Sequence, residues 1–131
     1  MRKLISTGFE LEEKYGYSRA VVEGNWVFVS GTTGMDYTTN EMPDDIAEQT
    51  RNCIRNIEWA LKEAKGDLEH IVRLETFLVE GSDAHACFEV VGEAFGGIRP
   101  ANTAVYVSAL VDPRMLVEIQ ATAILPEEYS Y

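Results

Sequence analysis

The segment PDDIAEQTRNCIRNIEWALKEAKG, residues 43–66, carries the clearest structural signal in the chain. Asp45 stands three residues before Glu48, the spacing of a helix capping box, and Gly66 is a natural residue to follow a helix end. Between them apolar residues recur at intervals of three, four and seven, the period of one helix face: Ile46, Cys53, Ile54, Ile57 and Leu61. The segment therefore predicts one long helix that buries a single face.

A β-hairpin is predicted ahead of this helix, over residues 18–30. Residues 18–22 and 26–30 are rich in β-branched and aromatic side chains, and Gly24 between them can adopt the positive φ of a tight turn. A loop rich in Gly, Thr and Asn, residues 31–42, then joins the hairpin to the helix.

More strands and one shorter helix are predicted after the long helix. Residues 71–79 predict a strand with four side chains on one face: Val72, Leu74, Thr76 and Leu78. A second helix should run from Ser82-Asp83 to Gly96-Gly97 and bury four side chains: Ala84, Phe88, Val91 and Phe95. Residues 102–110 and 116–124 predict two further strands. The last strand alternates between an apolar face, with Val117, Ile119, Ala121 and Ala123, and a polar face, with Glu118, Gln120 and Thr122.

The element order ββ–α–β–α–ββ predicts an α/β (α+β) fold for a single domain over residues 1–131. Each helix has one apolar face, so both helices should cover the same side of one sheet. Right-handed crossovers would make the strands on either side of each helix parallel to one another. The opposite sheet face needs another cover, and its mixed polar and aliphatic character favours a partner subunit over solvent.

Composition excludes several classes of function. The 131 residues include 22 acidic and 11 basic side chains, which gives a net charge of −11. Nucleic-acid binders need a basic face, so no nucleic-acid partner is expected. No apolar run is long enough to span a bilayer and no signal peptide is recognisable, so no membrane partner is expected either. With two cysteines, the chain is predicted to be cytoplasmic with reduced thiols.

Four segments, in order, resemble the Rid (YjgF-type) family, whose members often carry an endoribonuclease L-PSP label. These segments are Phe-Val-Ser-Gly (28–31), Met-Pro-Asp-Asp-Ile-Ala-Glu-Gln-Thr-Arg (42–51), Arg-Pro-Ala (99–101) and Val-Glu-Ile-Gln-Ala (117–121). The match extends over nearly the whole chain with consistent spacing. The resemblance implies a chorismate-mutase-like fold and a homotrimer whose sheets form a central barrel. It also implies three small-molecule pockets between subunits.

Catalytic members of the Rid family hydrolyse imines and enamines derived from amino acids, without a metal or a cofactor. The resemblance places the catalytic glutamate at Glu118, which would aim a water molecule and shuttle a proton. It also places Tyr17, Ser30 and Gly31 in the substrate pocket, where the missing side chain of Gly31 would let a ligand approach the backbone. The residues alone leave an alternative open for two of these positions: an interface or solvent-facing acid at Glu118 and a packing tyrosine at Tyr17.

The sequence departs from the family pattern after Pro100-Ala101, where an arginine should hold the substrate carboxylate. The residues at this place are Asn102, Thr103 and Ala104. An amide carries no charge and reaches less far than a guanidinium, so carboxylate binding should weaken. Arg19 is a hypothesis for the missing cation, because it should share a face with the pocket tyrosine. The alternative is an arginine at a solvated strand edge.

The remaining residues with reactive side chains predict structural roles. Cys53 lies on the apolar helix stripe and Cys87 within the shorter helix, so both should be inert core thiols. His70 and His85 lack metal-ligand spacing and are expected at the surface or as caps. Three functions stay open: a Rid-like hydrolase, a non-catalytic binder of small metabolites, and a ribonuclease, which the charge balance disfavours. The acid at Glu118 favours the hydrolase.

Overall fold

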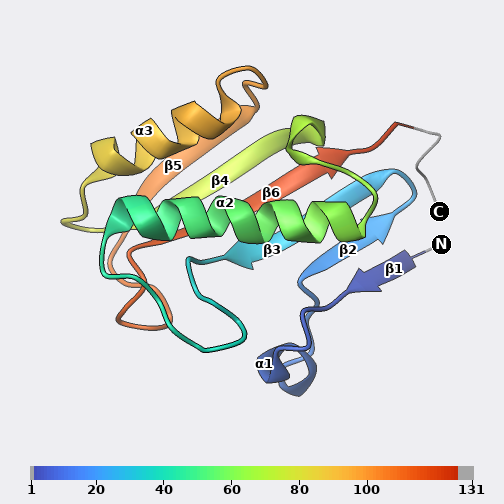
Figure 1. The fold of residues 1–131 in the computed structure, drawn as a ribbon, viewed down its shortest axis with the longest axis horizontal. Coiled ribbons are helices and arrows are strands. Elements are labelled where there is room, and N and C mark those ends of the chain that lie inside the picture. The colour runs from blue at the N-terminus through green and yellow to red at the C-terminus, as the bar shows by residue number, and fades with distance from the viewer. Residues whose placement is uncertain (1, 127–131) are drawn as a thin grey trace.

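One six-stranded sheet organises residues 2–126, the part of the chain that the computed structural model describes (Figure 1). The strands lie in the order β1–β2–β3–β6–β4–β5, with the bounds β1 Arg2–Ile5, β2 Ala20–Glu23, β3 Trp26–Thr32, β4 Ile71–Val79, β5 Ala101–Val107 and β6 Val117–Ile124. The helices are α1 Glu10–Lys14, α2 Ile46–Glu63 and α3 Ala84–Phe95, and a 3₁₀ turn spans Leu68–His70. The predicted fold class, a single mixed sheet with two main helices, is confirmed.

The strand pairing is antiparallel everywhere except between β4 and β5. Both β3 and β4 run antiparallel to β6, which lies between them, so β3 and β4 are parallel to one another. The strands on either side of α2, and those on either side of α3, are therefore parallel, as predicted. The last strand thus enters the middle of the sheet, with β3 on one side and β4 on the other.

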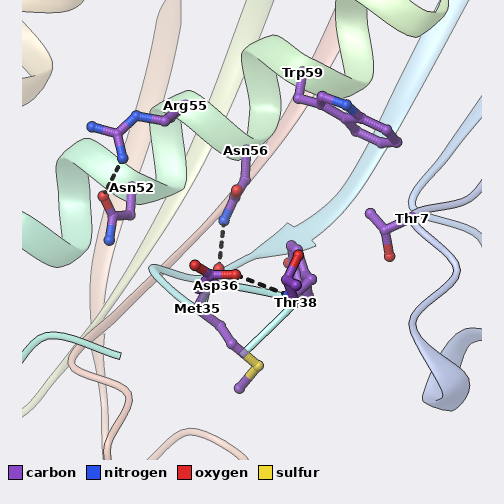
Figure 2. Close-up of a pocket in the computed structure, with 9 residues that line it drawn as sticks. Thr7, Met35, Asp36, Thr38, Asn52, Arg55, Asn56 and Trp59 are labelled. Atoms are coloured by element: carbon purple, nitrogen blue, oxygen red, sulfur yellow. Dashed lines mark hydrogen bonds between the residues drawn. The ribbon is translucent and has the colours of Figure 1, made fainter. Parts of the chain in front are cut away.

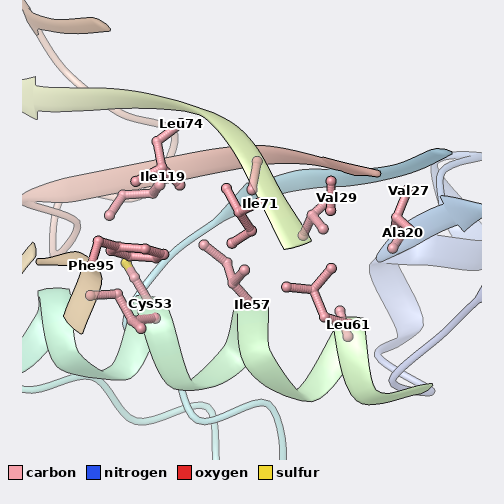
Figure 3. Close-up of a cluster of buried hydrophobic side chains, with 14 of the residues drawn as sticks. Ala20, Val27, Val29, Cys53, Ile57, Leu61, Ile71, Leu74, Phe95 and Ile119 are labelled. Carbon is pink, nitrogen blue, oxygen red and sulfur yellow. The ribbon is translucent and has the colours of Figure 1, made fainter. Parts of the chain in front are cut away.

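The core fills the space between the sheet and the two main helices, which lie on the same sheet face (Figure 1). Ile57 and Leu61 of α2 are fully buried and point toward the sheet, as Figure 3 shows. All five apolar residues predicted for this helix face are buried. Truncating a buried isoleucine or leucine to alanine typically costs about 2–5 kcal/mol, so this layer contributes much of the stability of the fold.

The ends of α2 are capped, although not quite as predicted. Asp45 Oδ2 accepts a hydrogen bond from the Glu48 amide at 3.0 Å, but the Glu48 carboxylate pairs with Arg51, so only half of the capping box forms. At the other end the Lys65 backbone, and not that of Gly66, adopts the left-handed conformation, with φ 66°. Gly66 is needed for space, because a Cβ there would lie 2.5 Å from Cδ2 of Leu125.

Two predicted side-chain placements are wrong: Val72 on the same strand face as Leu74, and Phe88 among the buried residues of the second helix. Val72 is 44% exposed because a bulge interrupts the β4–β6 register at this point: Ile71 pairs with Ala123, and Arg73 pairs with Thr122. Phe88 is 42% exposed because the buried stripe of α3 passes along a neighbouring line of residues: Cys87, Val90, Val91 and Phe95.

The structure also contains one strand that was not predicted and one that ends earlier than predicted. The structure adds β1, which pairs with β2 and has three exposed residues out of four, so its sequence lacks the alternation of a half-buried strand. β5 ends at Val107, before the predicted end at Leu110.

The sheet face opposite the helices carries apolar side chains that nothing in the described residues 2–126 covers. Trp26 and Phe28 stack on one another with ring centroids 5.9 Å apart, yet they are 45% and 47% exposed. Val105 on β5 is 45% exposed and lies level with Phe77 and Glu118 across the sheet. We call this surface the open face. Within residues 2–126, no helix combines the length and apolar character needed to cross a membrane.

Candidate functional site

Glu118 is the acid at the centre of the site. It lies on β6 between Val117 and Ile119, which are fully buried against the helices, so the alternation of the strand directs Glu118 to the open face. Partial burial raises the pKa of the Glu118 carboxyl group, and the positive charge of Arg19 partly offsets that rise. A carboxyl group in such surroundings takes up and releases a proton closer to neutral pH than an exposed one.

Gly31 is the backbone neighbour of this carboxyl group. It lies where the β3–β6 register shifts, between Val29 and Thr32. A Cβ at this position would overlap Oε2 of Glu118 and lie 2.9 Å from its Cδ. In this chain the missing side chain therefore makes room for the glutamate, while the approach of a ligand to the Gly31 backbone stays a prediction.

Arg19 is enclosed, so its alternative assignment as a solvated strand-edge residue is wrong. It is only 3% exposed. Nη2 donates to the Gly31 carbonyl at 2.7 Å, and Nη1 donates to the hydroxyl oxygen of Tyr37 at 2.5 Å. Its Nε is buried and has no hydrogen-bond partner in the part of the chain that the structure describes. A positive charge is thus fixed next to the glycine that contacts Glu118.

Tyr37 is a member of this cluster that the sequence did not single out. Its ring packs against Phe9, with centroids 5.4 Å apart and an interplanar angle of 56°. Burial raises the pKa of its phenol, and Arg19 partly offsets this, so the hydroxyl is neutral and can accept from the guanidinium. The only hint in the sequence is an aromatic residue within a loop of small and polar residues.

The two other pocket residues predicted near Gly31 lie close to this cluster. Tyr17 is 41% exposed and lies near enough to Tyr37 to act on it electrostatically. Ser30 donates its hydroxyl hydrogen to the Ser18 carbonyl at 2.6 Å, which leaves the oxygen lone pairs as the free part of this side chain.

The segment from Asn102 to Ala104 is not brought to Glu118 within one chain. It lies on β5, and β4 separates this strand from β6. Asn102 is level with the fully buried Leu74, so it projects to the helix side, opposite to the open face, and its Oδ1 accepts from Thr76 Oγ1 at 3.1 Å. Thr103 alternates to the open face, and all three residues are exposed at the sheet edge.

A cleft of about 400 Å³ opens beside Tyr37, between α2, the loop over residues 33–41 and Thr7 (Figure 2). Its polar groups mainly fix the loop. Asn56 donates to the carbonyls of Thr33 and Met35, both at 3.0 Å, and Asp36 accepts from the Thr38 amide at 2.8 Å. The cleft thus shows how the loop that carries Tyr37 is attached to α2.

The thiols and imidazoles take structural roles, as predicted. Cys53 and Cys87 are fully buried, and burial raises the pKa of each thiol, which disfavours the reactive thiolate. His70 Nδ1 accepts from the Asp67 amide at 3.0 Å and so caps the 3₁₀ turn, and the exposed His85 lies 2.8 Å from Glu89. In the described range, no three His, Cys, Asp or Glu side chains converge in a way that could hold a metal ion.

Comparisons with known proteins agree with each other. The family model described as endoribonuclease L-PSP matches residues 8–125. A RutC family protein of Pyrococcus abyssi is 39% identical over 108 residues, which are 82% of this chain and 84% of the relative. A Rattus norvegicus protein named 2-iminobutanoate/2-iminopropanoate deaminase is 31% identical over 125 residues, which are 95% of this chain and 90% of the relative. A solved structure from Mycobacterium tuberculosis, of the YjgF/YER057c/UK114 family, has a TM-score of 0.87 at 43% identity and covers 95% of this chain and 100% of its own.

Proposed function

Because the chain belongs to the endoribonuclease L-PSP family, the YjgF or Rid proteins, we propose that it hydrolyses a small imine or enamine and releases ammonia. The name of the rat relative, 2-iminobutanoate/2-iminopropanoate deaminase, supports this reaction class. The substrate of this chain is one of that class or a related carbonyl derivative. The binding pocket belongs to an assembly of several chains.

The observation that carries the proposal is the pairing of Glu118 with Gly31. The carboxyl group is half-buried on the open face, its pKa is raised by burial, and no side chain at Gly31 stands in its way. Arg19 places positive charge next to this pair. Such a group can act as a base toward water and then as an acid toward a leaving amine.

The reaction needs only water as a co-reactant. Glu118 takes a proton from a water molecule while the water oxygen bonds to the carbon of a protonated C=N group, which gives a carbinolamine. The proton then passes from Glu118 to the nitrogen, the C–N bond breaks to release ammonia, and the regenerated Glu118 carboxylate accepts the proton that the oxygen loses as the carbonyl forms, before releasing it to solvent. The products are ammonia and a carbonyl compound, and a 2-oxo acid results when the substrate carries a carboxylate.

Recognition of such a carboxylate is assigned to two places in this proposal. Arg19 contributes its charge from behind Gly31, since its enclosed guanidinium acts through the field and not through an exposed fork. Asn102, with Thr103 and Ala104, would contribute uncharged contacts from the exposed β5 edge of a neighbouring chain. Because Asn102 lacks the charge of an arginine, affinity for 2-oxo acids should be weak.

A homotrimer with a central barrel would place those two groups together. The open face carries Trp26, Phe28 and Val105, and apolar side chains gathered on one face of a sheet mark an interaction surface. In the proposed assembly this face lines the barrel, and each of three pockets combines Glu118 of one chain with the β5 edge of the next. Sizing should give about three times the chain mass of 14.7 kDa.

The alternative function is a module that binds a small metabolite in the same pocket without turnover, and the uncharged Asn102 favours it. Ribonuclease activity is the least favoured, because the net charge of −11 opposes the approach of RNA. A cytoplasmic location stays a prediction.

The decisive experiment is ammonia release from freshly generated 2-iminobutanoate or 2-aminoacrylate. The parent protein is compared with Glu118→Ala and Asn102→Arg at equal concentration. Turnover by the parent that is lost in Glu118→Ala supports the proposal. Activity gained only in Asn102→Arg means that the acid–base machinery is intact and the anion site is incomplete. Absence of turnover in all three proteins contradicts hydrolysis and favours the binding module.

A further inference from the structure

Among the residues that the structure describes, Arg19 is an enclosed cation without a carboxylate partner. Within residues 2–126 its side chain makes two hydrogen bonds, and both acceptors are uncharged: the hydroxyl oxygen of Tyr37 and the carbonyl oxygen of Gly31. Its Nε has no acceptor. A charge removed from water is normally compensated by a charge of opposite sign, so this arrangement needs an explanation.

The carboxylate of Glu118, which has the opposite charge, lies near Arg19. Gly31 lies between the two groups, with its carbonyl accepting from Arg19 and its Cα against the Glu118 carboxylate. Arg19 is also the charged group that acts on Glu118 electrostatically. Nevertheless, Glu118 takes part in neither of the hydrogen bonds that Arg19 makes in the described chain. The two side chains are neighbours, but they are held out of direct contact.

Tyr37 is the side chain that accepts a hydrogen bond from the guanidinium of Arg19. Its hydroxyl oxygen accepts the hydrogen bond that Nη1 of Arg19 donates, and its ring packs against Phe9. The loop around it is fixed to α2, because Asn56 donates to the carbonyl of Met35 at 3.0 Å and Asn52 donates to that of Gly34 at 3.3 Å. An anchored acceptor of this kind can hold Arg19 in one position.

We propose that Tyr37 is a positioning residue: its hydroxyl and the Gly31 carbonyl hold the guanidinium of Arg19 where it does not form an ion pair with Glu118. This inference rests on the proposed function in one respect, namely that Glu118 transfers protons. A carboxylate locked into an ion pair holds its negative charge and exchanges its proton poorly. Tyr37 thus keeps the acid available while the positive charge stays next to the substrate.

Removing the Tyr37 hydroxyl leaves Nη1 without its acceptor. Glu118 is then the nearby group that can satisfy both the hydrogen bond and the charge, so Arg19 should turn toward it. The other titratable groups that act on this cluster are Tyr17, from the segment before β2, and Cys53, from α2. Glu75 on β4 lies two register positions from Glu118, on the same sheet face. All three remain in place in the variant, so a changed titration reports on Arg19.

The test is to titrate the Glu118 carboxyl group by carbon-13 NMR in the full-length protein, with the resonance assigned by its loss in Glu118→Gln. Parent, Tyr37→Phe and the matched control Tyr15→Phe, at the exposed C-cap tyrosine of α1, are compared. The expected result is a lower pKa of Glu118 in Tyr37→Phe than in the parent, and no change in Tyr15→Phe. Ammonia release by Tyr37→Phe should fall about tenfold or more, with the largest effect on kcat, since proton transfer is impaired.

An unchanged or higher pKa of Glu118 in Tyr37→Phe overturns the inference. If that variant does not fold, the parent titration decides alone: a pKa below the ordinary glutamate value of 4.5 means that Arg19 already pairs with Glu118, and a higher value agrees with separated charges. The titration needs no turnover. A parent that releases no ammonia, but whose Glu118 pKa falls in Tyr37→Phe, would contradict the proposed function and leave the role of Tyr37 intact.

Discussion

The Cα of Gly31 lies directly against the carboxylate of Glu118, and a Cβ there would lie 2.9 Å from the carboxyl carbon. Gly31→Ala should therefore displace the acid. The fold should survive, because the clash is with the flexible end of a side chain and the Gly31 backbone does not adopt a positive φ. We expect ammonia release to fall by roughly 10²-fold, the lower end of the contribution of a general acid or base, with little change in melting temperature.

Gly92→Ala is the matched control for this substitution. Gly92 lies on α3 with open space around the position of a Cβ, and alanine favours a helix by about 1 kcal/mol over glycine. The control should therefore keep its turnover and melt slightly higher. Equal turnover in Gly31→Ala and Gly92→Ala would show that the contact between Gly31 and Glu118 has no catalytic importance.

Glu118 should also make stability depend on pH. Burial raises the pKa of its carboxyl group in the folded protein, so the folded state holds the proton to a higher pH than the unfolded chain does. The stability linked to this proton is complete below the ordinary glutamate pKa of 4.5 and is lost as the pH rises through the raised value. Glu118→Gln has no such proton to lose.

This dependence is measured by urea unfolding of the parent and Glu118→Gln across this pH window, at fixed protein concentration. The free energy of unfolding of the parent should fall relative to that of the variant as the pH increases. A difference that stays constant, or that moves in favour of the parent at high pH, is incompatible with a raised pKa at Glu118.

The fold was largely predictable because its main signals are local. The helical period of α2 and the alternation of β6 each reflect which side of a single element faces the core. The burial of Ile57 and the position of Glu118 on the face away from the core were therefore predicted correctly from their own segments. Val72 was not, because a bulge is a property of the pairing between β4 and β6 and leaves no mark on β4 alone. The predicted burial of Phe88 was wrong because α3 has apolar residues on more than one face. Which of these faces is buried depends on how α3 packs against α2.

Residues of the candidate site could be predicted only where they match a sequence motif of the family. Glu118 and Gly31 were placed by resemblance, and the structure brings them into contact. The enclosure of Arg19 was not foreseen, because its burial depends on Tyr37, which comes from a loop 18 residues away in the sequence. No period or spacing encodes a contact of that kind. It arises where the loop folds back onto α2.

Disrupting the open face should dissolve the proposed trimer. Phe28 stacks on Trp26 and is 47% exposed in the single chain, so a partner that covers this face would bury it. Phe28→Glu would place a charge in that contact, and an unpaired buried charge costs several kcal/mol. Light scattering coupled to size exclusion should report a change from about three times the chain mass to the mass of one chain.

Val111→Glu is the control, because Val111 is 96% exposed and lies between β5 and β6, outside the sheet. It should leave the mass unchanged. If Phe28→Glu keeps the mass of the parent, the open face is not the interface. Ligand binding should be lost together with assembly, since Glu118 and the Asn102 segment lie on different strands of one chain and meet only between chains in the proposed trimer.

Asn102→Arg should add a positively charged anion site at the β5 edge. In the proposed trimer, the β5 edge that carries residue 102 of one chain lies beside Glu118 of the next, and a longer guanidinium side chain at this edge could hold a carboxylate with charge-assisted hydrogen bonds. Such a bond contributes about 1.5–3 kcal/mol, so affinity for 2-oxobutanoate should rise roughly ten- to hundredfold in calorimetry.

Asn102→Gln is the uncharged control and should bind no better than the parent. Arginine removes the acceptor of Thr76 Oγ1, which is 1% exposed, and should lose about 1–3 kcal/mol of stability. Glutamine keeps an amide oxygen but moves it one methylene further from the backbone, so only a gain in affinity that is specific to arginine supports the anion site. Equal affinities for parent and Asn102→Arg would mean that residue 102 does not reach the ligand, and the proposed placement of the β5 edge beside Glu118 would then be wrong.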